Sequence, residues 1–388
     1  MSKRSDRPEE TDPNAIQQLK KARTTATTTL TKANHSPDCQ DPDCDGCDVG
    51  EVEISFVQGD ETVQPTAYEL LTMAKEEQGN TDMARRLFDL ALEAFETEQG
   101  KTGLGYAQCL VELGRALTVD ESIREGYQLY AAVKTPTVES QLWHSRAALA
   151  LARSIRQQKS RSYEELRLDL ENSDGEIEDE VALDELVVKD QVSKEEQKLY
   201  KEAIGLLDKV LENHATLTEK ELTLVRQAMH DMREYGELLE QPTHATHVAK
   251  LFDTLTRYIQ LFPYENDDSL LTLWSACLLH QQKFANGKEK EEMCTQAEKR
   301  IQQAKDVYFA KYNKENASAW ELYAMLRMSQ SDMAEEEDQV LELFDESVSA
   351  YKKALELDPE NEKLQEMLEL LDGPTANDDD DDEDEEDN

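Results

Sequence analysis

Long hydrophobic runs are missing from this chain of 388 residues. No stretch approaches the roughly 20 consecutive apolar residues that a membrane-spanning helix requires, which argues against an integral membrane protein. The first residues, MSKRSDRPEETDPN, have no apolar core, so they do not predict a secretory signal. Six cysteines are too few for a disulfide scaffold in a chain of this length. These absences favour a reducing compartment, and we expect the protein in the nucleus, with the cytoplasm as a second location.

Basic residues are scarce as well. The chain has 42 Lys and Arg residues against 85 Asp and Glu residues, a formal net charge of −43. A surface this negative repels nucleic acids and anionic membranes and attracts basic partners. No basic stripe of useful length offsets it, so neither direct nucleic-acid binding nor membrane binding is predicted. We expect the ligands to be proteins, with a preference for basic ones, and we expect the chain itself to be a monomer.

Familiar catalytic signatures are also absent. The chain has no HExxH pair, no Gly-rich phosphate-binding loop, no nucleophile elbow and no kinase signature. Cys109, Cys277 and Cys294 are scattered over predicted helices, where a cysteine is most simply a small core residue. We therefore expect no catalytic residue, no cofactor and no enzymatic activity.

One cluster of potential metal ligands stands near the N-terminus. Its members are His35, Cys39, Cys44 and Cys47, within the sequence HSPDCQDPDCDGC. Thiolates and imidazole suit a tetrahedral zinc site, and the C-x4-C-x2-C spacing also resembles three of the four ligands of a plant-type iron–sulfur centre. Neighbouring aspartates, however, oppose formation of the thiolates. We favour the interpretation that this is a flexible cysteine-bearing tail without a metal.

Low-complexity segments divide the chain. Residues 1–60 are rich in Thr, Ser, Asp and Pro and predict a disordered N-terminal tail that carries the cysteine cluster. Residues 373–388 end in ten consecutive acids and predict an acidic, disordered C-terminal tail. An acidic insertion is expected over residues 164–192. It separates N-terminal helical repeats, over residues 61–163, from C-terminal helical repeats, over residues 193–372.

Helical periodicity dominates between the tails. The predicted helices include residues 104–117, 138–158 and 288–312, and Asp358-Pro359 separates the last two helices. Strand signal is almost missing. Residues 51–57 alternate as EVEISFV, but no partner strand is evident, and an isolated strand of this length would not be stable.

Two segments share the spacing of a tetratricopeptide repeat, in which small residues let two helices approach and an aromatic residue fills the groove between them. The repeat-defining residues are Tyr68, Leu71, Gly79, Ala84, Phe88 and Ala91 in the first segment, and Trp320, Tyr323, Ser347, Tyr351, Ala354 and Pro359 in the second. Each helix pair has an apolar stripe that it cannot bury alone, so neighbouring pairs stack. The sequence therefore predicts an all-α, tetratricopeptide-like helical-repeat solenoid with disordered N- and C-terminal tails. The alternative is a non-repetitive helical domain with chance alanine spacing.

The layout resembles the fungal enhancer of translation termination family, whose fission-yeast relative is a negative regulator of a prolyl-hydroxylase-like oxygenase. The resemblance covers residues 60–371 and rests on the helical segments GNTDMARRLFDLALEAFE, LVELGRAL and RAALALAR, the acidic segment after them and the final repeat at residues 347–359. It implies a nuclear, non-enzymatic adapter that affects translation termination or the turnover of a transcription factor.

A histone chaperone is the alternative function. In that interpretation the acid-rich segments at residues 164–190 and 378–387 receive basic tails, as in the nuclear autoantigenic sperm protein group, which this chain also resembles. Salt separates the two hypotheses, because charge on exposed acidic runs is screened within about 8 Å at 0.15 M ionic strength, whereas binding in an apolar groove persists.

Overall fold

The computed structural model describes residues 56–58, 61–77, 80–172, 187–188 and 190–372. The predicted C-terminal tail, residues 173–186 and 189 of the predicted acidic insertion, and the predicted N-terminal tail apart from residues 56–58 lie outside these residues. So do Gly79 and the four candidate metal ligands, His35, Cys39, Cys44 and Cys47. Residues 56–58 form a strand, which the prediction of a tail over residues 1–60 did not include. Within the described residues, no helix combines the length and the hydrophobicity of a bilayer span.

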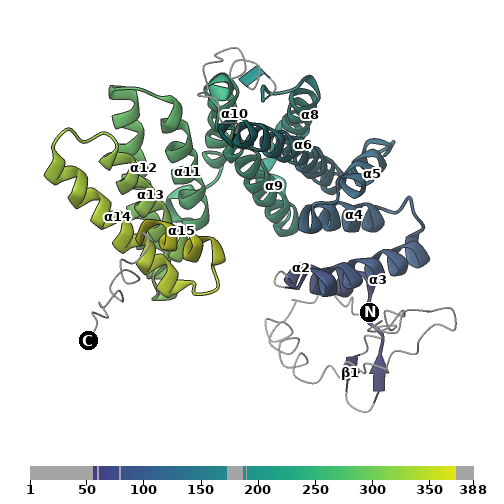
Figure 1. The fold of residues 1–388 in the computed structure, drawn as a ribbon. Coiled ribbons are helices and arrows are strands. Elements are labelled where there is room, and N and C mark those ends of the chain that lie inside the picture. The colour runs from purple at the N-terminus through teal and green to yellow at the C-terminus, as the bar shows by residue number, and fades with distance from the viewer. Residues whose placement is uncertain (1–55, 59–60, 78–79, 173–186, 189, 373–388) are drawn as a thin grey trace, which may run out of the picture. The chain divides into compact units, whose positions relative to one another are not determined.

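The described residues are almost entirely helical, and consecutive helices pack against one another in pairs (Figure 1). This confirms the predicted all-α helical-repeat class. The chain divides into two compact units, Met1–Ala132 and Val133–Asn388. The division precedes the predicted acidic insertion and lies just before a long helix.

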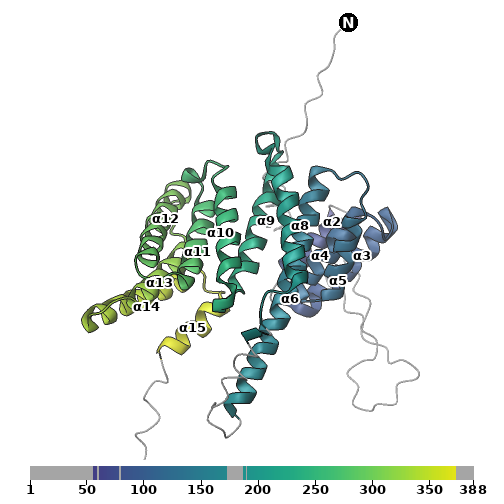
Figure 2. The ribbon, with the colours of Figure 1, turned by 90° about the horizontal axis from the view of Figure 1, so that it is seen from above.

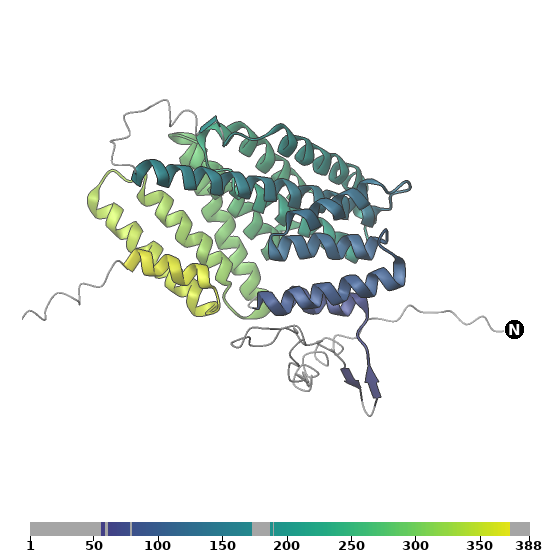
Figure 3. The same cartoon turned by 45° about the vertical axis from the view of Figure 1, so that its right-hand side comes forward.

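The described part of the first unit starts with a short hairpin, followed by four helices. Strand β1 (Phe56–Gln58) pairs antiparallel with β2 (Glu61–Val63), with Phe56 opposite Val63. The expectation that residues 51–57 have no partner strand was therefore wrong, because the partner follows two residues later. The helices are α2 (Ala67–Glu76), α3 (Thr81–Gln99), α4 (Leu104–Leu117) and α5 (Asp120–Ala131). Figure 3 shows α2 and α3 side by side.

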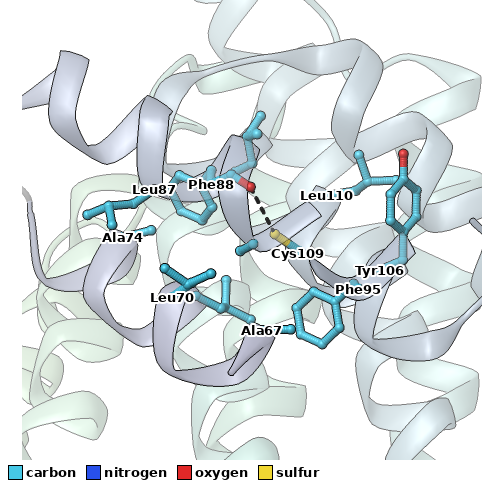
Figure 4. Packing of buried hydrophobic residues seen from close by; sticks show 12 residues of the cluster. Ala67, Leu70, Ala74, Leu87, Phe88, Phe95, Tyr106, Cys109 and Leu110 are labelled. Atoms are coloured by element: carbon cyan, nitrogen blue, oxygen red, sulfur yellow. Dashed lines mark hydrogen bonds between the residues drawn. The ribbon is translucent and has the colours of Figure 1, made fainter. Parts of the chain in front are cut away.

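The core of the first unit forms where α2, α3 and α4 meet. Phe88 and Phe95 of α3 are fully buried there, beside Leu70 of α2 and Leu110 of α4 (Figure 4). Leu71 of α2 belongs to the same cluster. The Cys109 thiol faces the Phe88 carbonyl oxygen at 3.8 Å, and burial raises the pKa of this thiol to about 12. Cys109 is thus a neutral core residue. Cys277 and Cys294 are buried too, as expected for all three.

Nine helices of the second unit are described, and they again pack in consecutive pairs (Figure 2). Helix α6 contacts α8 and α9, α10 contacts α9 and α11, α11 contacts α12, and α13 contacts α14. Their bounds are α6 (Val138–Asn172), α8 (Lys194–Leu211), α9 (Glu219–Glu237), α10 (Ala245–Ile259), α11 (Asp268–Gln281), α12 (Lys288–Tyr312), α13 (Ala317–Ser331), α14 (Glu337–Leu357) and α15 (Glu362–Asp372).

Helix α6 is longer than predicted. It continues past residue 158 to Asn172, into the first part of the segment predicted as an acidic insertion. The residues EELRLDLEN that begin this segment are mostly good helix formers, and Arg167 pairs with Glu164 one turn earlier. The segment was predicted as a loop because of its acidic composition, although its individual residues favour a helix.

A buried network of charges joins α6 to the last residues of the predicted insertion and to the chain after them. Arg156 of α6 is fully buried, and its Nε donates to Glu196 Oε1 at 2.9 Å. Its Nη1 donates to Asp190 Oδ1 at 2.8 Å and to the Asp190 carbonyl oxygen at 2.6 Å. The carbonyl oxygen of Asp190 also lies 2.8 Å from His244 Nε2. Arg156 Nη1 also lies 3.2 Å from His244 Nε2. One guanidinium therefore joins α6 to Asp190, to Glu196 near the start of α8, and to His244 just before α10.

Substitution of two glycines by alanine would test how closely α4 and α5 approach. A Cβ at Gly114 of α4 would lie 2.3 Å from Ile123 Cγ1 and 2.7 Å from the Val119 carbonyl oxygen, whereas nothing lies within 4 Å of a Cβ at Gly205 of α8. We expect Gly114→Ala to reduce the free energy of unfolding by about 1–3 kcal/mol through overpacking. Gly205→Ala should increase it by about 1 kcal/mol, because alanine is the better helix former.

Urea unfolding followed by circular dichroism measures both glycine variants. The substitution is the same in each, so opposite signs would identify packing as the cause. A Gly114→Ala protein as stable as the parent would contradict the close approach of α4 and α5.

Candidate protein-binding groove

A groove of about 780 Å³ opens between α12 and α14 in the second unit, with α13 as its floor. We call it the α13 groove. The residues that line it are Gln302 and Lys305 from α12, Trp320 and Tyr323 from α13, and Glu342, Asp345, Glu346, Ser349, Ala350 and Lys353 from α14.

Small residues bring α14 close enough to form one wall. Ala350 and Ala354 are buried against Ala324 of α13, and the buried Ser347 hydroxyl donates to the Ala324 carbonyl oxygen at 2.8 Å. Tyr351 is buried in the same cluster. The second set of repeat-defining residues therefore includes Ser347, Tyr351 and Ala354 at the α13–α14 contact, while Pro359 is exposed beyond the end of α14.

The floor of the groove is aromatic. Trp320 and Tyr323 are three residues apart on α13 and therefore share one face of the helix. Their rings meet edge to face, with centroids 5.8 Å apart and an interplanar angle of 86°. Both side chains are only partly buried, and both line the groove.

A lysine from the neighbouring helix occupies this aromatic corner. Lys305 Nζ lies 3.3 Å from the centroid of the Trp320 ring and 4.2 Å from that of Tyr323. Within the described part of the chain, no carboxylate lies within ion-pair distance of this ammonium. Burial lowers the pKa of Lys305 to about 8, and the nearby charge of Glu315 only partly offsets it. The ammonium is thus held by ring faces rather than by a counter-ion.

Lys353 is the other cation that lines the groove, and both Lys353 and the neighbouring Arg327, which contacts Tyr323, have carboxylate partners. Arg327 Nε lies 2.8 Å from Glu346, and its Nη2 lies 3.0 Å from Glu298. Lys353 Nζ lies 3.3 Å from Glu315. On the wall formed by α14, two exposed carboxylates, Glu342 and Asp345, make no ion pair with any residue that the structure describes. The groove therefore presents unpaired acids opposite a ring-bound ammonium.

The first set of repeat-defining residues forms a core instead. Leu71, Phe88 and Ala91 belong to the core cluster of α2, α3 and α4, and Ala84 is buried as well. Tyr68 is 48% exposed, and its ring contacts the edge of Phe95 at 4.9 Å between centroids.

Sequence reasoning missed Lys305, Glu342 and Asp345. On α12, Lys305 directly follows Ala304, which belongs to the buried stripe that also contains Ile301. Its position beside a buried stripe could have indicated that Lys305 lies close to another helix. That position does not reveal which aromatic rings of the next helix its ammonium contacts.

No protein-family model and no curated protein sequence matches this chain. A solved structure that matches is described as a circular tandem repeat protein with novel repeat topology and enhanced subunit contact surfaces. It is 14% identical, with a TM-score of 0.32, and the match covers 79% of this chain and 75% of the other. A structural likeness this distant does not support any assignment of fold or function. The helical-repeat assignment therefore rests on the pairing of helices described above.

Proposed function

We propose that this protein is a non-enzymatic scaffold that holds a segment of a partner protein in the α13 groove. The observation that carries the proposal is the aromatic floor, because partly exposed Trp and Tyr side chains in a cleft are the residues that dominate protein interfaces. Stacked helix pairs offer extended surfaces of this kind for binding. No catalytic residue is assigned.

The groove suits a short segment rather than a whole domain. The lining residues of α14 run from Glu342 to Lys353, eleven residues further along the helix, a rise of roughly 16 Å. That length matches about five extended residues or about three turns of a helix. The unpaired carboxylates of Glu342 and Asp345 and the net charge of −43 favour a basic segment.

The finer role that we propose is that of a nuclear adapter in translation termination or in the turnover of a transcription factor. Its support is the family resemblance of the sequence, and the groove supplies a physical site through which such an adapter would act.

Truncation of the aromatic floor of the groove should weaken binding of the partner protein. We expect Trp320→Ala to lower recovery of the principal partner about 30-fold in affinity purification with quantitative mass spectrometry, because truncation of an interface hot spot costs about 2 kcal/mol or more. Tyr68→Ala is the matched control, since Tyr68 is an exposed aromatic residue outside the groove. Circular dichroism of each variant reports whether the fold is retained. Equal recovery with folded Trp320→Ala protein would refute the proposal.

The histone-chaperone alternative predicts a different result. If acidic runs hold the partner, removal of residues 373–388 and a rise in salt should each release it, while Trp320→Ala should have little effect. We expect the opposite pattern, with the partner retained after this deletion.

A further inference from the structure

The aromatic corner of the α13 groove already holds a cation that belongs to the chain itself. Two rings that meet at 86° present their faces to one ammonium at 3.3 and 4.2 Å. Aromatic sites for lysine, arginine and quaternary ammonium ligands bind their cation in the same way, through the negative ring faces. The corner is therefore built as a cation site, and Lys305 fills it.

We propose that Lys305 is a built-in competitor, which occupies the corner of Trp320 and Tyr323 until a lysine or arginine side chain of a basic partner segment displaces it. The inference rests on the proposed function, and it names the chemistry of the partner and the way in which the groove is kept occupied without one.

The surroundings of Lys305 favour release of its ammonium from the aromatic corner. Its ammonium is half-buried and has no carboxylate partner among the described residues, so in the groove it has lost hydration without gaining a counter-ion. Release into solvent recovers that hydration. The long, flexible lysine side chain makes release possible without movement of α12.

The wall opposite Lys305 favours a basic segment. Glu342 and Asp345 are exposed, lie three residues apart on one face of α14, and make no ion pair with a described residue. A segment that places one cation in the aromatic corner can pair its neighbouring cations with these two carboxylates. An acidic segment would meet like charge at the same wall, in a chain of net charge −43.

The first test measures affinity in the full chain, with acetylated hexa-arginine as the probe and fluorescence anisotropy as the readout. Lys305→Met keeps an apolar side chain on the rings but removes the competing ammonium, and should tighten binding roughly 5- to 30-fold, the range of a cation–π contact worth about 1–2 kcal/mol. Lys353→Met is the matched control, because Lys353 lines the same groove but is paired with Glu315. A simple charge effect would strengthen both variants equally and would overturn the proposal, as would unchanged or weaker binding by Lys305→Met.

The second test follows Lys305 directly. Brief amine acetylation with peptide mapping by mass spectrometry reports how accessible each lysine is, with and without the probe, which carries no free amine itself. Displacement predicts that labelling of Lys305 rises when hexa-arginine binds, while labelling of the exposed Lys314 stays constant. Labelling of Lys305 that stays constant or falls would show that the ammonium remains in the corner, and the proposal would be wrong.

The two levels of the hypothesis fail separately. If Trp320→Ala leaves the principal partner bound, the groove is not the partner site and the proposed function fails. If Trp320→Ala releases the partner but Lys305→Met has no effect on probe affinity, the groove is the partner site and only the competitor role of Lys305 fails.

Discussion

Replacing Arg156 by methionine is expected to lower the free energy of unfolding of the second unit by about 3–5 kcal/mol, since it leaves buried carboxylates without their cation. Asp190 and Glu196 are at most 3% exposed in the structure. Burial raises the pKa of Glu196, but the hydrogen bond and the charge of Arg156 more than offset this, so the pKa lies below its ordinary value. Without the guanidinium, Glu196 keeps only the partly exposed Lys159, 3.5 Å away, as a cation. Protonation or hydration of the two buried carboxyl groups then disrupts the packing of α6 on α8.

Urea unfolding followed by circular dichroism measures the loss. Arg161→Met is the control, because Arg161 lies on the same helix but is exposed, and substitutions at such positions usually change stability by less than about 0.5 kcal/mol. Hydrogen exchange should localise the Arg156→Met effect to the start of α8 and the start of α10, where the guanidinium has its partners. A loss no larger than that of Arg161→Met would mean that the network contributes little.

Truncating Phe88 to alanine is expected to destabilise the first unit by about 3–5 kcal/mol. Phe88 is fully buried in the cluster shared by α2, α3 and α4, and its removal takes away both buried apolar surface and the side chain that fills the space between these helices (Figure 4). Repacking should recover little of the loss, because the neighbouring residues Ala84 and Ala91 are small and cannot extend into the cavity.

Hydrogen exchange is the decisive measurement for Phe88→Ala. Protection should fall throughout α2, α3 and α4, because these helices share one core. Arg85→Ala, an exposed change one turn earlier on α3, should leave protection unaltered. Faster exchange confined to the immediate surroundings of residue 88 would contradict a cooperative core.

Helix positions followed closely from local sequence. The predicted bounds 104–117 and 288–312 agree with α4 and α12. The reason is that apolar periodicity and helix-ending residues act over a few positions: α12 follows Gly287, and it ends at Asn313 in a left-handed conformation. The prediction failed for the end of α6, where overall acidity was taken as a sign of a loop although the individual residues favour a helix.

The groove could be predicted only in part. Trp320 and Tyr323 were recognised as repeat residues, because their spacing belongs to one helix. Lys305 was not associated with them, because it reaches the rings from a different helix, across the turn that separates α12 from α13.

By itself, the sequence determined that the chain forms paired amphipathic helices. The apolar stripe that each helix buries comes from the spacing of residues within one short segment, so it can be recognised without the tertiary structure. Tertiary structure alone decided which charged side chains meet: Arg156 with Asp190, Glu196 and His244, and Lys305 with two aromatic rings. Those contacts depend on the rotation and crossing of helices that are distant in the sequence. In a chain with 85 acidic residues, the sequence offers far too many possible partners for any one cation to reveal which it has.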